Sequence, residues 1–234
     1  MNGCSIVCVM NNQMMESMQI RSCRDSDYVE CREIFTEGMQ QLINLVTRVV
    51  FPRYLWYIAM ATIVSVLAFM KWSIWILILN LFVSLVLSAL LYVDIYLECW
   101  KFVNYCLKTD LMEISKSYMC NDSCHMWVAE WHGRVVGMVG LIADEKQKPG
   151  VAEVQRMTVS SSFRKMGVGR KLLEELLSYA KQQRLKRIVL TTTSAQAPAI
   201  GLYKKYGFSL VGVSPYPQKI LGDLEYWLFD LELQ

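Results

Sequence analysis

Residues 159–170 (VSSSFRKMGVGR) have the types and spacing that most clearly predict chemistry. Gly167 and Gly169 stand where a predicted strand and loop give way to a helix. The first N–H groups of a helix are unpaired and lie at the positive end of its dipole, and glycine lets a ligand approach the backbone. Helix starts of this kind bind phosphate groups. The segment therefore predicts a diphosphate site.

Positive charge accompanies the two glycines. The basic side chains of this loop are Arg164, Lys165, Arg170 and Lys171, and they would complement an anionic ligand. The loop lacks the Gly-Lys-Ser/Thr of nucleoside triphosphatases, and it lacks the G-x-G-x-x-G spacing of dinucleotide sites. These two common diphosphate sites are therefore excluded.

A second motif follows at residues 199–208 (AIGLYKKYGF). The order of a strand, R-x-x-G-x-G and a helix, followed by A-x-x-x-Y-x-x-x-G-F, resembles the two signatures of the GCN5-related N-acetyltransferase (GNAT) superfamily. The resemblance covers residues 18–48 and 94–234. It implies that the co-substrate is acetyl-CoA and that the partner substrate is a small amine.

The resemblance also implies which residues contact acetyl-CoA. Backbone groups near residues 157–159 would hold the pantetheine arm and polarise the acetyl carbonyl. The expected cofactor-binding residues are Met157, Thr158, Val159, Arg164, Lys165, Met166, Gly167, Val168, Gly169, Arg170 and Gln196. Gln196 departs from the family pattern, because many acetyltransferases have Asn at that position.

Acetyl transfer requires that the amine lose a proton and that the leaving thiolate gain one. By resemblance, Glu153 on the preceding strand is the expected catalytic base, and Tyr203 in the second motif is the expected acid. Two plainer interpretations stay open: Glu153 as a solvated strand residue, and Tyr203 as a packing aromatic. Arg156 has the charge to bind an acceptor carboxylate, but a surface charge is the default interpretation.

A long apolar block interrupts the domain. Between residues 55 and 93 the only charged side chain is Lys71. One helix of this length would extend about 58 Å, whereas a bilayer core is about 30 Å thick. Two arms, residues 55–70 and 73–93, with a turn at Lys71 and Trp72, would fit the bilayer. A buried helical hairpin of a soluble protein and a re-entrant membrane hairpin are the alternatives.

Aromatic residues lie near both ends of the arms, as in interfacial belts of membrane proteins. They are Tyr54, Trp56, Tyr57, Trp72, Trp75, Tyr92, Tyr96 and Trp100. An apolar hairpin inserted between the first two helices of an acetyltransferase domain resembles the camello (N-acetyltransferase 8-like) group, which includes cysteine-S-conjugate N-acetyltransferase and N-acetylaspartate synthetase. Residues 107–111 (LKTDL), 127–130 (WVAE) and 135–140 (VVGMVG) are also similar to that group.

Hydrophobic periodicity predicts an α+β (α/β) domain with a central mixed sheet flanked by helices. Strands are expected at residues 18–22, 126–131, 134–143, 151–159, 187–190, 208–213 and 224–231, and helices after a cap at Asp25 and at residues 96–118, 168–184 and 198–206. The expected organisation is a tail (1–17), a first part of the GNAT domain (18–48), a membrane hairpin (49–93) and the remainder (94–234), with the acetyl-CoA site at 157–170.

Charge and composition exclude other classes. The 234 residues include 24 basic and 21 acidic side chains, a net charge of +3 that gives no reason to expect nucleic-acid binding. No C-x-x-C pair occurs among eight cysteines, and the two histidines, His125 and His132, lie outside the motifs. We therefore expect that the protein binds no metal and that its thiols are reduced. We expect one histidine at a strand edge and the other in a turn.

These features predict a membrane-anchored N-acetyltransferase that moves an acetyl group from acetyl-CoA to a primary amine of a small amino acid or amino-acid conjugate. Two alternatives remain open: an acetyltransferase of protein lysines, and a catalytically silent acetyl-CoA-binding membrane adaptor. The expected location is the endoplasmic reticulum membrane. Arg48 and Arg53 flank the block, which favours a cytosolic catalytic domain.

Overall fold

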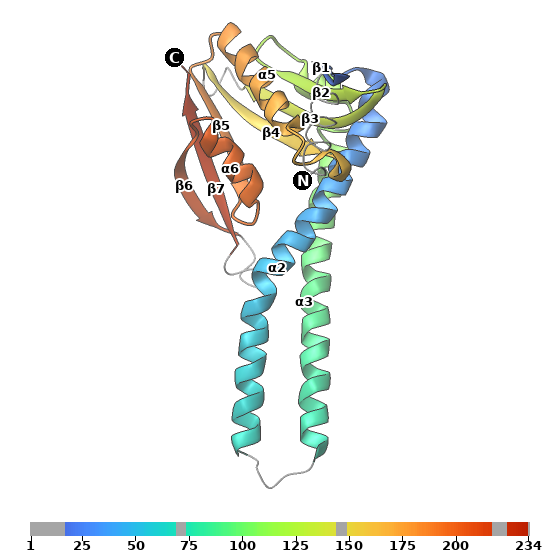
Figure 1. Ribbon diagram of the computed structural model, residues 1–234, viewed down its shortest axis with the longest axis vertical. Helices are drawn as coiled ribbons and strands as arrows, with labels where there is room; N and C mark the ends of the chain where they lie inside the picture. The colour runs from blue at the N-terminus through green and yellow to red at the C-terminus, as the bar shows by residue number, and fades with distance from the viewer. Residues whose placement is uncertain (1–16, 69–73, 144–148, 217–223, 234) are drawn as a thin grey trace, which may run out of the picture.

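Seven strands form one mixed sheet in the order β1-β2-β3-β4-β5-β7-β6 (Figure 1). The computed structural model describes residues 17–68, 74–143, 149–216 and 224–233. The strands are β1 (Gln19–Ser22), β2 (His125–Trp131), β3 (Arg134–Ala143), β4 (Val151–Val159), β5 (Arg187–Thr193), β6 (Ser209–Pro215) and β7 (Glu225–Glu232). All seven expected strands are present, and neighbouring strands are antiparallel except β4 and β5.

Helices cover the sheet and also extend away from it. They are the short 3-10 turns η1 (Asp25–Asp27) and η2 (Ser161–Phe163) and the α-helices α2 (Tyr28–Ala68), α3 (Ile74–Lys108), α4 (Ile114–Tyr118), α5 (Val168–Gln182) and α6 (Ala197–Lys205). Some expected boundaries were wrong: the strand expected over residues 187–190 continues to Thr193, and one expected helix is divided. The helix predicted over residues 96–118 is the end of α3, a turn, and then α4, because the chain reverses after Lys108 to lay α4 against the sheet.

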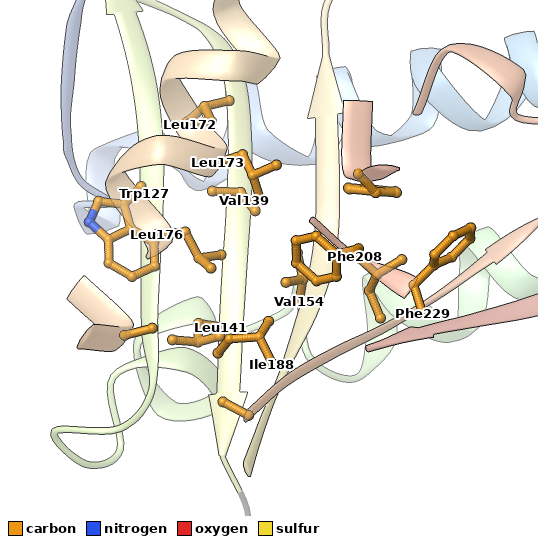
Figure 2. Packing of buried hydrophobic residues seen from close by; sticks show 14 of the residues in the cluster. Trp127, Val139, Leu141, Val154, Leu172, Leu173, Leu176, Ile188, Phe208 and Phe229 are labelled. Carbon is orange, nitrogen blue, oxygen red and sulfur yellow. The ribbon is translucent and has the colours of Figure 1, made fainter. Parts of the chain in front are cut away.

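One face of the sheet packs against α5 and α6. The apolar stripe of α5 is fully buried through Leu172, Leu173 and Leu176, which meet Val139 and Leu141 of β3 (Figure 2). Burial of each such leucine stabilises the fold by about 1.5–3 kcal/mol. This packing sets the start of α5 at the end of β4.

The other face packs against the first turns of α2, the end of α3 and α4. Cys31, Ile34 and Phe35 of α2 are buried there, as their helical spacing predicts. Val128 and Met138 of the sheet complete this second core. The two cores together hold β2, β3 and β4 between layers of helix.

The rest of α2 and α3 forms a long pair of helices that leaves the sheet domain (Figure 1). Its side chains include large exposed apolar residues, among them Trp56, Leu81 and Leu85. Among the described residues one stretch, Ile78–Lys108, is long and apolar enough to cross a membrane by length and composition. The turn expected at Lys71 and Trp72 lies outside the described residues.

A third apolar cluster joins the base of this helical pair to the far half of the sheet. Ile43 and Val50 of α2 and Ile95 of α3 pack with Ala195, which precedes α6, and Leu224, which precedes β7. The helical pair therefore contacts both halves of the sheet domain. The first turns of α2 pack on β2, β3 and β4, and the third cluster reaches the segments before α6 and β7.

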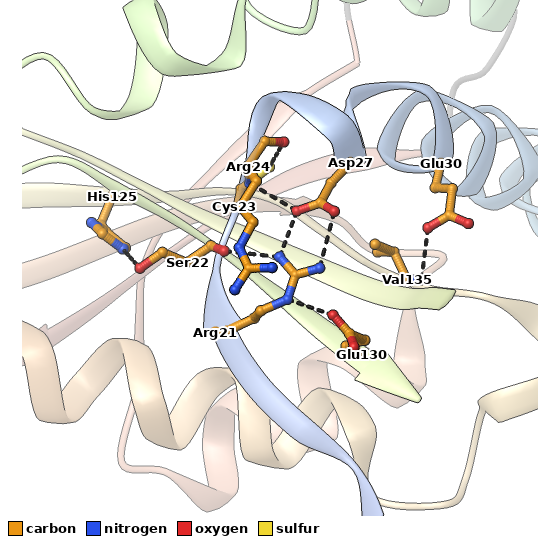
Figure 3. Close-up of polar contacts among 9 residues, drawn as sticks. All are labelled: Arg21, Ser22, Cys23, Arg24, Asp27, Glu30, His125, Glu130 and Val135. Carbon is orange, nitrogen blue, oxygen red and sulfur yellow. Dashed lines mark hydrogen bonds and ion pairs between the residues drawn. The ribbon is translucent and has the colours of Figure 1, made fainter. Parts of the chain in front are cut away.

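A polar network ties the edge strand β1 to the start of α2 (Figure 3). The Arg21 guanidinium donates to both Asp27 oxygens, at 2.6 and 3.0 Å, and to Glu130 of β2. Asp27 also accepts the Arg24 N–H at 2.8 Å. The helix cap expected at Asp25 was wrong: the N-cap position is Arg24, whose N–H the Asp27 carboxylate accepts, and Asp25 instead accepts the Ser115 hydroxyl.

Candidate active site

Strands β4 and β5 are paired over only three residues each. The parallel register runs from Val151 with Arg187 to Glu153 with Val189. Beyond that point β4 continues beside β3, and β5 continues beside β7. The two central strands therefore part, and the second half of β4 presents one backbone edge to the gap between them.

Helix α5 begins at the end of β4. Gly167 is its N-cap and has a φ of 89°, a left-handed conformation that costs other residues about 1 kcal/mol. Lys165 is also left-handed, at 60°. These two positions turn the loop sharply, and the first helical turn with its unpaired N–H groups lies beside the end of β4, where a Cβ at Gly169 would meet Met157 and Val159.

Gly169 lies one residue inside α5, where ordinary helix geometry gives no reason for glycine. A Cβ atom built there would meet the Met157 side chain at 3.5 Å and those of Leu202 and Val159 at 3.8 Å. These are normal contact distances, so the protein's own packing tolerates a side chain. A requirement for glycine at this position would therefore come from a ligand approaching the backbone.

The loop between β4 and α5 is held from a distant part of the chain. The Glu37 carboxylate of α2 accepts the Ser161 N–H at 3.0 Å and the Ser160 hydroxyl at 3.1 Å. Burial alone would raise the pKa of Glu37, but these bonds and the charge of Arg164 hold it below its usual value. Sequence reasoning missed Glu37, because nothing in the sequence pairs residues 123 positions apart.

A β-bulge shapes the middle of β4. Gly140 of β3 pairs with Gln155 and Met138 pairs with Thr158, so β4 carries one extra residue between these pairs. Arg156, in the bulge, has a φ of 53°. Because of the extra residue, the Met157 side chain lies on the α5 and α6 side of the sheet, where it contacts the Tyr203 hydroxyl of α6.

Tyr203 lies on α6 and is almost fully buried. Its hydroxyl is 3.6 Å from the Met157 sulfur, and burial raises the pKa of Tyr203 to about 12. Because Met157 also borders Gly169, the structure brings together three of the expected site residues: the glycine at the helix start, the strand residue and the tyrosine.

Glu153 lies on the opposite face of β4 from Met157. Its carboxylate accepts the Gln155 amide at 3.1 Å, and its side chain is partly exposed. Glu153 stands at the last β4–β5 pair, where the strands begin to part. The expected base and the expected acid therefore lie toward opposite faces of the sheet.

Three further expected contacts lie around the loop, the cap of α6 and the core of α5. Arg164 reaches back to the Val159 carbonyl at 3.0 Å, which keeps it on the loop. Gln196 is the N-cap of α6, and its amide lies 3.5 Å from the Thr193 hydroxyl. Val168 is 1% exposed in the α5 core, so its backbone, but not its side chain, is available to a ligand.

Arg156 is not a surface charge, and that default interpretation was wrong. Its guanidinium forms a two-pronged ion pair with Asp110, at 2.7 and 3.0 Å, between the rings of Phe35 and Phe102. Burial alone would lower the pKa of Arg156, but the Asp110 carboxylate raises it above its usual value. This guanidinium is therefore already paired and is not free for an acceptor carboxylate.

The histidines take structural positions. His125 opens β2 and hydrogen-bonds the Ser22 hydroxyl at 2.8 Å, and His132 has a φ of 48° in the turn before β3. Among the residues that the structure describes, no group of three His, Cys, Asp or Glu side chains is placed to hold a metal ion.

Known proteins resemble this chain in sequence and in fold. A sequence model of the "Acetyltransferase (GNAT) family" matches residues 91–208. N-acetyltransferase 8 of Mus musculus is 30% identical over 227 residues, 94% of this chain and 93% of that protein. The probable N-acetyltransferase camello of Xenopus tropicalis is 29% identical over 212 residues, 88% of this chain and 92% of that protein.

A solved structure supports the same architecture. The crystal structure of an acetyltransferase of the GNAT family from Staphylococcus aureus Mu50 superposes with a TM-score of 0.57, covering 93% of this chain and 99% of the other. The two sequences are 17% identical, so this likeness concerns the fold alone.

Proposed function

The chain belongs to the acetyltransferase (GNAT) family, and from that premise we propose that it is a membrane-anchored enzyme that moves the acetyl group of acetyl-CoA to the primary amine of a small amino acid or amino-acid conjugate. One observation carries the proposal. The parting of β4 and β5 leaves a backbone edge that leads directly to the glycine start of α5.

Acetyl-CoA supplies an activated thioester, and the residues at the parting strands suit its parts. The diphosphate would lie on the first turn of α5, where Gly167 and Gly169 leave the backbone open. Residues 157–159 would hold the pantetheine arm through backbone hydrogen bonds. Gln196 would add a contact from the α6 cap.

Two side chains would move the protons. Glu153 would take a proton from the attacking amine, and Tyr203 would give one to the leaving thiolate. The raised pKa of Tyr203, about 12, supports the second role, because the hydroxyl keeps its proton at neutral pH. Their positions on opposite faces of β4 would let amine and thioester meet in the gap.

The helical pair α2 and α3 would anchor the domain in a bilayer. The length of Ile78–Lys108 and the exposed apolar residues on both helices support insertion. Residues 49–93 would form the inserted hairpin, and the domain would lie in the cytosol at the endoplasmic reticulum. Both helices begin or end in one domain, so the hairpin must enter and leave on one side.

The test is thiol release from acetyl-CoA by the purified full chain in detergent, with a panel of amines. Free amino acids, cysteine S-conjugates and lysine peptides form the three arms, and each is run with wild type and with Glu153→Gln. We expect release with one of the first two arms and loss of release in the variant. Release only with lysine peptides would identify a protein acetyltransferase. Acetyl-CoA binding without release in any arm would indicate an adaptor.

A further inference from the structure

A chain of hydrogen bonds leads from the base of α3 to Glu153. It starts at the ion pair between Arg156 and Asp110, directly after α3 ends. Asp110 also accepts the Tyr118 hydroxyl at 2.6 Å, and that hydroxyl lies 3.4 Å from Oε1, the side-chain amide oxygen of Gln155. The Gln155 amide nitrogen then donates to Glu153 at 3.1 Å.

The orientation of the Gln155 amide follows from its two neighbours. A carboxylate only accepts hydrogen bonds, so the amide must present its nitrogen to Glu153 and its oxygen to Tyr118. The reverse orientation would place the amide oxygen against the carboxylate. The one Tyr118 proton is directed mainly at Asp110 and is shared with the Gln155 oxygen at the longer distance, so the amide has its oxygen toward Tyr118 and its nitrogen toward Glu153.

The ion pair between Arg156 and Asp110 fixes the other end of this series of hydrogen bonds. Arg156 makes two bonds to Asp110, and the rings of Phe35 and Phe102 lie 5.6 and 5.5 Å from its guanidinium. Burial alone would raise the pKa of Asp110, but the bonds from Arg156 and Tyr118 hold it below its usual value. Asp110 therefore stays charged at neutral pH and keeps both donors.

The sheet is shaped to admit Tyr118. Its ring lies under Gly140, where an added Cβ would be 2.5 Å from the nearest ring carbon. Gly140 is the β3 partner of Gln155. Because Gly140 has no side chain, the Tyr118 ring fits against the sheet there, and its hydroxyl lies close to Gln155, which bonds to Glu153.

We propose that Gln155 is a positioning residue for acetyl transfer, held by Tyr118 and the Asp110–Arg156 pair, and that it aims the Glu153 carboxylate at the incoming amine. This inference rests on the proposed function, in which Glu153 is the base. Gln155 itself touches neither substrate. Its contribution is the direction in which the carboxylate points, which matters because proton transfer requires close hydrogen-bond geometry.

The experiment compares Gln155→Leu, Glu153→Gln and the double variant of the full chain in detergent. We expect Gln155→Leu to lower kcat about tenfold, the lower range for one hydrogen bond to a charged group, with the KM for acetyl-CoA unchanged. In the Glu153→Gln background the same change should have no further effect, because the base is already absent. Gln182→Leu, an exposed change at the end of α5, is the matched control and should keep wild-type kinetics.

Tyr118→Phe keeps the test decisive if Gln155→Leu does not fold, because it removes one oxygen and leaves the ring under Gly140. It should lower kcat with an unchanged KM for acetyl-CoA, and its effect should also disappear in the Glu153→Gln background. Additive losses with Glu153→Gln would overturn the positioning role and leave the base in place. A wild-type rate in Glu153→Gln alone would overturn the base, and the inference with it.

Discussion

A Cβ atom added to Gly38 of α2 would lie 2.5 Å from the Cγ2 atom of Thr158 on β4. Helix and strand therefore approach too closely here for any side chain on the helix. Thr158 belongs to the strand edge proposed to hold the pantetheine arm, and α2 continues from Gly38 into the helical pair. The proposed cofactor strand and the proposed anchor thus touch at one glycine.

Substitution of Gly38 by Ala should displace β4. The methyl group cannot fit without movement of Thr158, and overpacking of this kind typically costs about 1–3 kcal/mol. We expect a lower melting temperature and weaker acetyl-CoA binding. Gly201→Ala is the control, because a Cβ there meets nothing within 4 Å. Equal stability of the two variants would contradict the close approach.

Substitution of Gly169 by Glu should abolish acetyl-CoA binding while the protein still folds and inserts. The protein leaves room at this site for a small side chain, but a carboxylate would occupy the diphosphate position and repel it. Gly167→Glu should have the same effect, with added backbone strain. Gly201→Glu, on the exposed face of α6, is the matched control. Unchanged affinity of Gly169→Glu by calorimetry would refute the assignment.

Replacement of Tyr203 by Phe should lower turnover about 100-fold, the lower range for general acid catalysis, with little change in acetyl-CoA affinity. Because the pKa of Tyr203 is about 12, the hydroxyl stays protonated and wild-type turnover should show no loss from this group between pH 8 and 10 (about two units below that pKa). Tyr206→Phe, at the C-cap of α6 and bonded to Glu174, is the control. A wild-type rate in Tyr203→Phe would assign this ring to packing.

Asp27 should make stability depend on acid pH. Burial alone would raise its pKa, but the bonds from Arg21 and Arg24 hold it below the usual value. A carboxyl with a lowered folded pKa contributes stability that is present above its unfolded pKa, about 3.9, and is lost as pH falls through the folded value. Asp27→Asn should cost about 3 kcal/mol at pH 7 and should flatten the fall in melting temperature below about pH 4. Asp122→Asn, an exposed change, should keep the wild-type profile.

Tags placed at Asn2 and Gln234 should face the same side of the membrane. Because α2 leaves the sheet domain and α3 returns to it, a single crossing would divide one core between two compartments. In sealed microsomes we expect protease to reach both tags, and a cysteine replacing Lys71 to label poorly from the cytosolic side. Tags on opposite sides would exclude the hairpin, whereas two lumenal tags would reverse only the orientation.

The sequence alone determined the features that depend on neighbouring residues. The glycine pair on either side of Val168, the stripe of leucines on α5 and the apolar block are each encoded within a few helical turns or one continuous run. Their physics is local, because capping, amphipathic period and hydrophobic length need no partner elsewhere in the chain. For this reason the strands, the family resemblance and the helical pair could all be predicted.

Only the tertiary structure decided which polar groups meet. Glu37 reaches Ser161 across 124 positions, and Arg156 reaches Asp110 across 46. These contacts form because packing of α2 and α3 against one face of the sheet brings Glu37 to the loop after β4 and Asp110 to Arg156 of β4, where each carboxylate meets hydrogen-bond donors. No local pattern encodes such a meeting, so the sequence analysis assigned Arg156 to the surface, while the folded chain pairs it with Asp110 near the rings of Phe35 and Phe102.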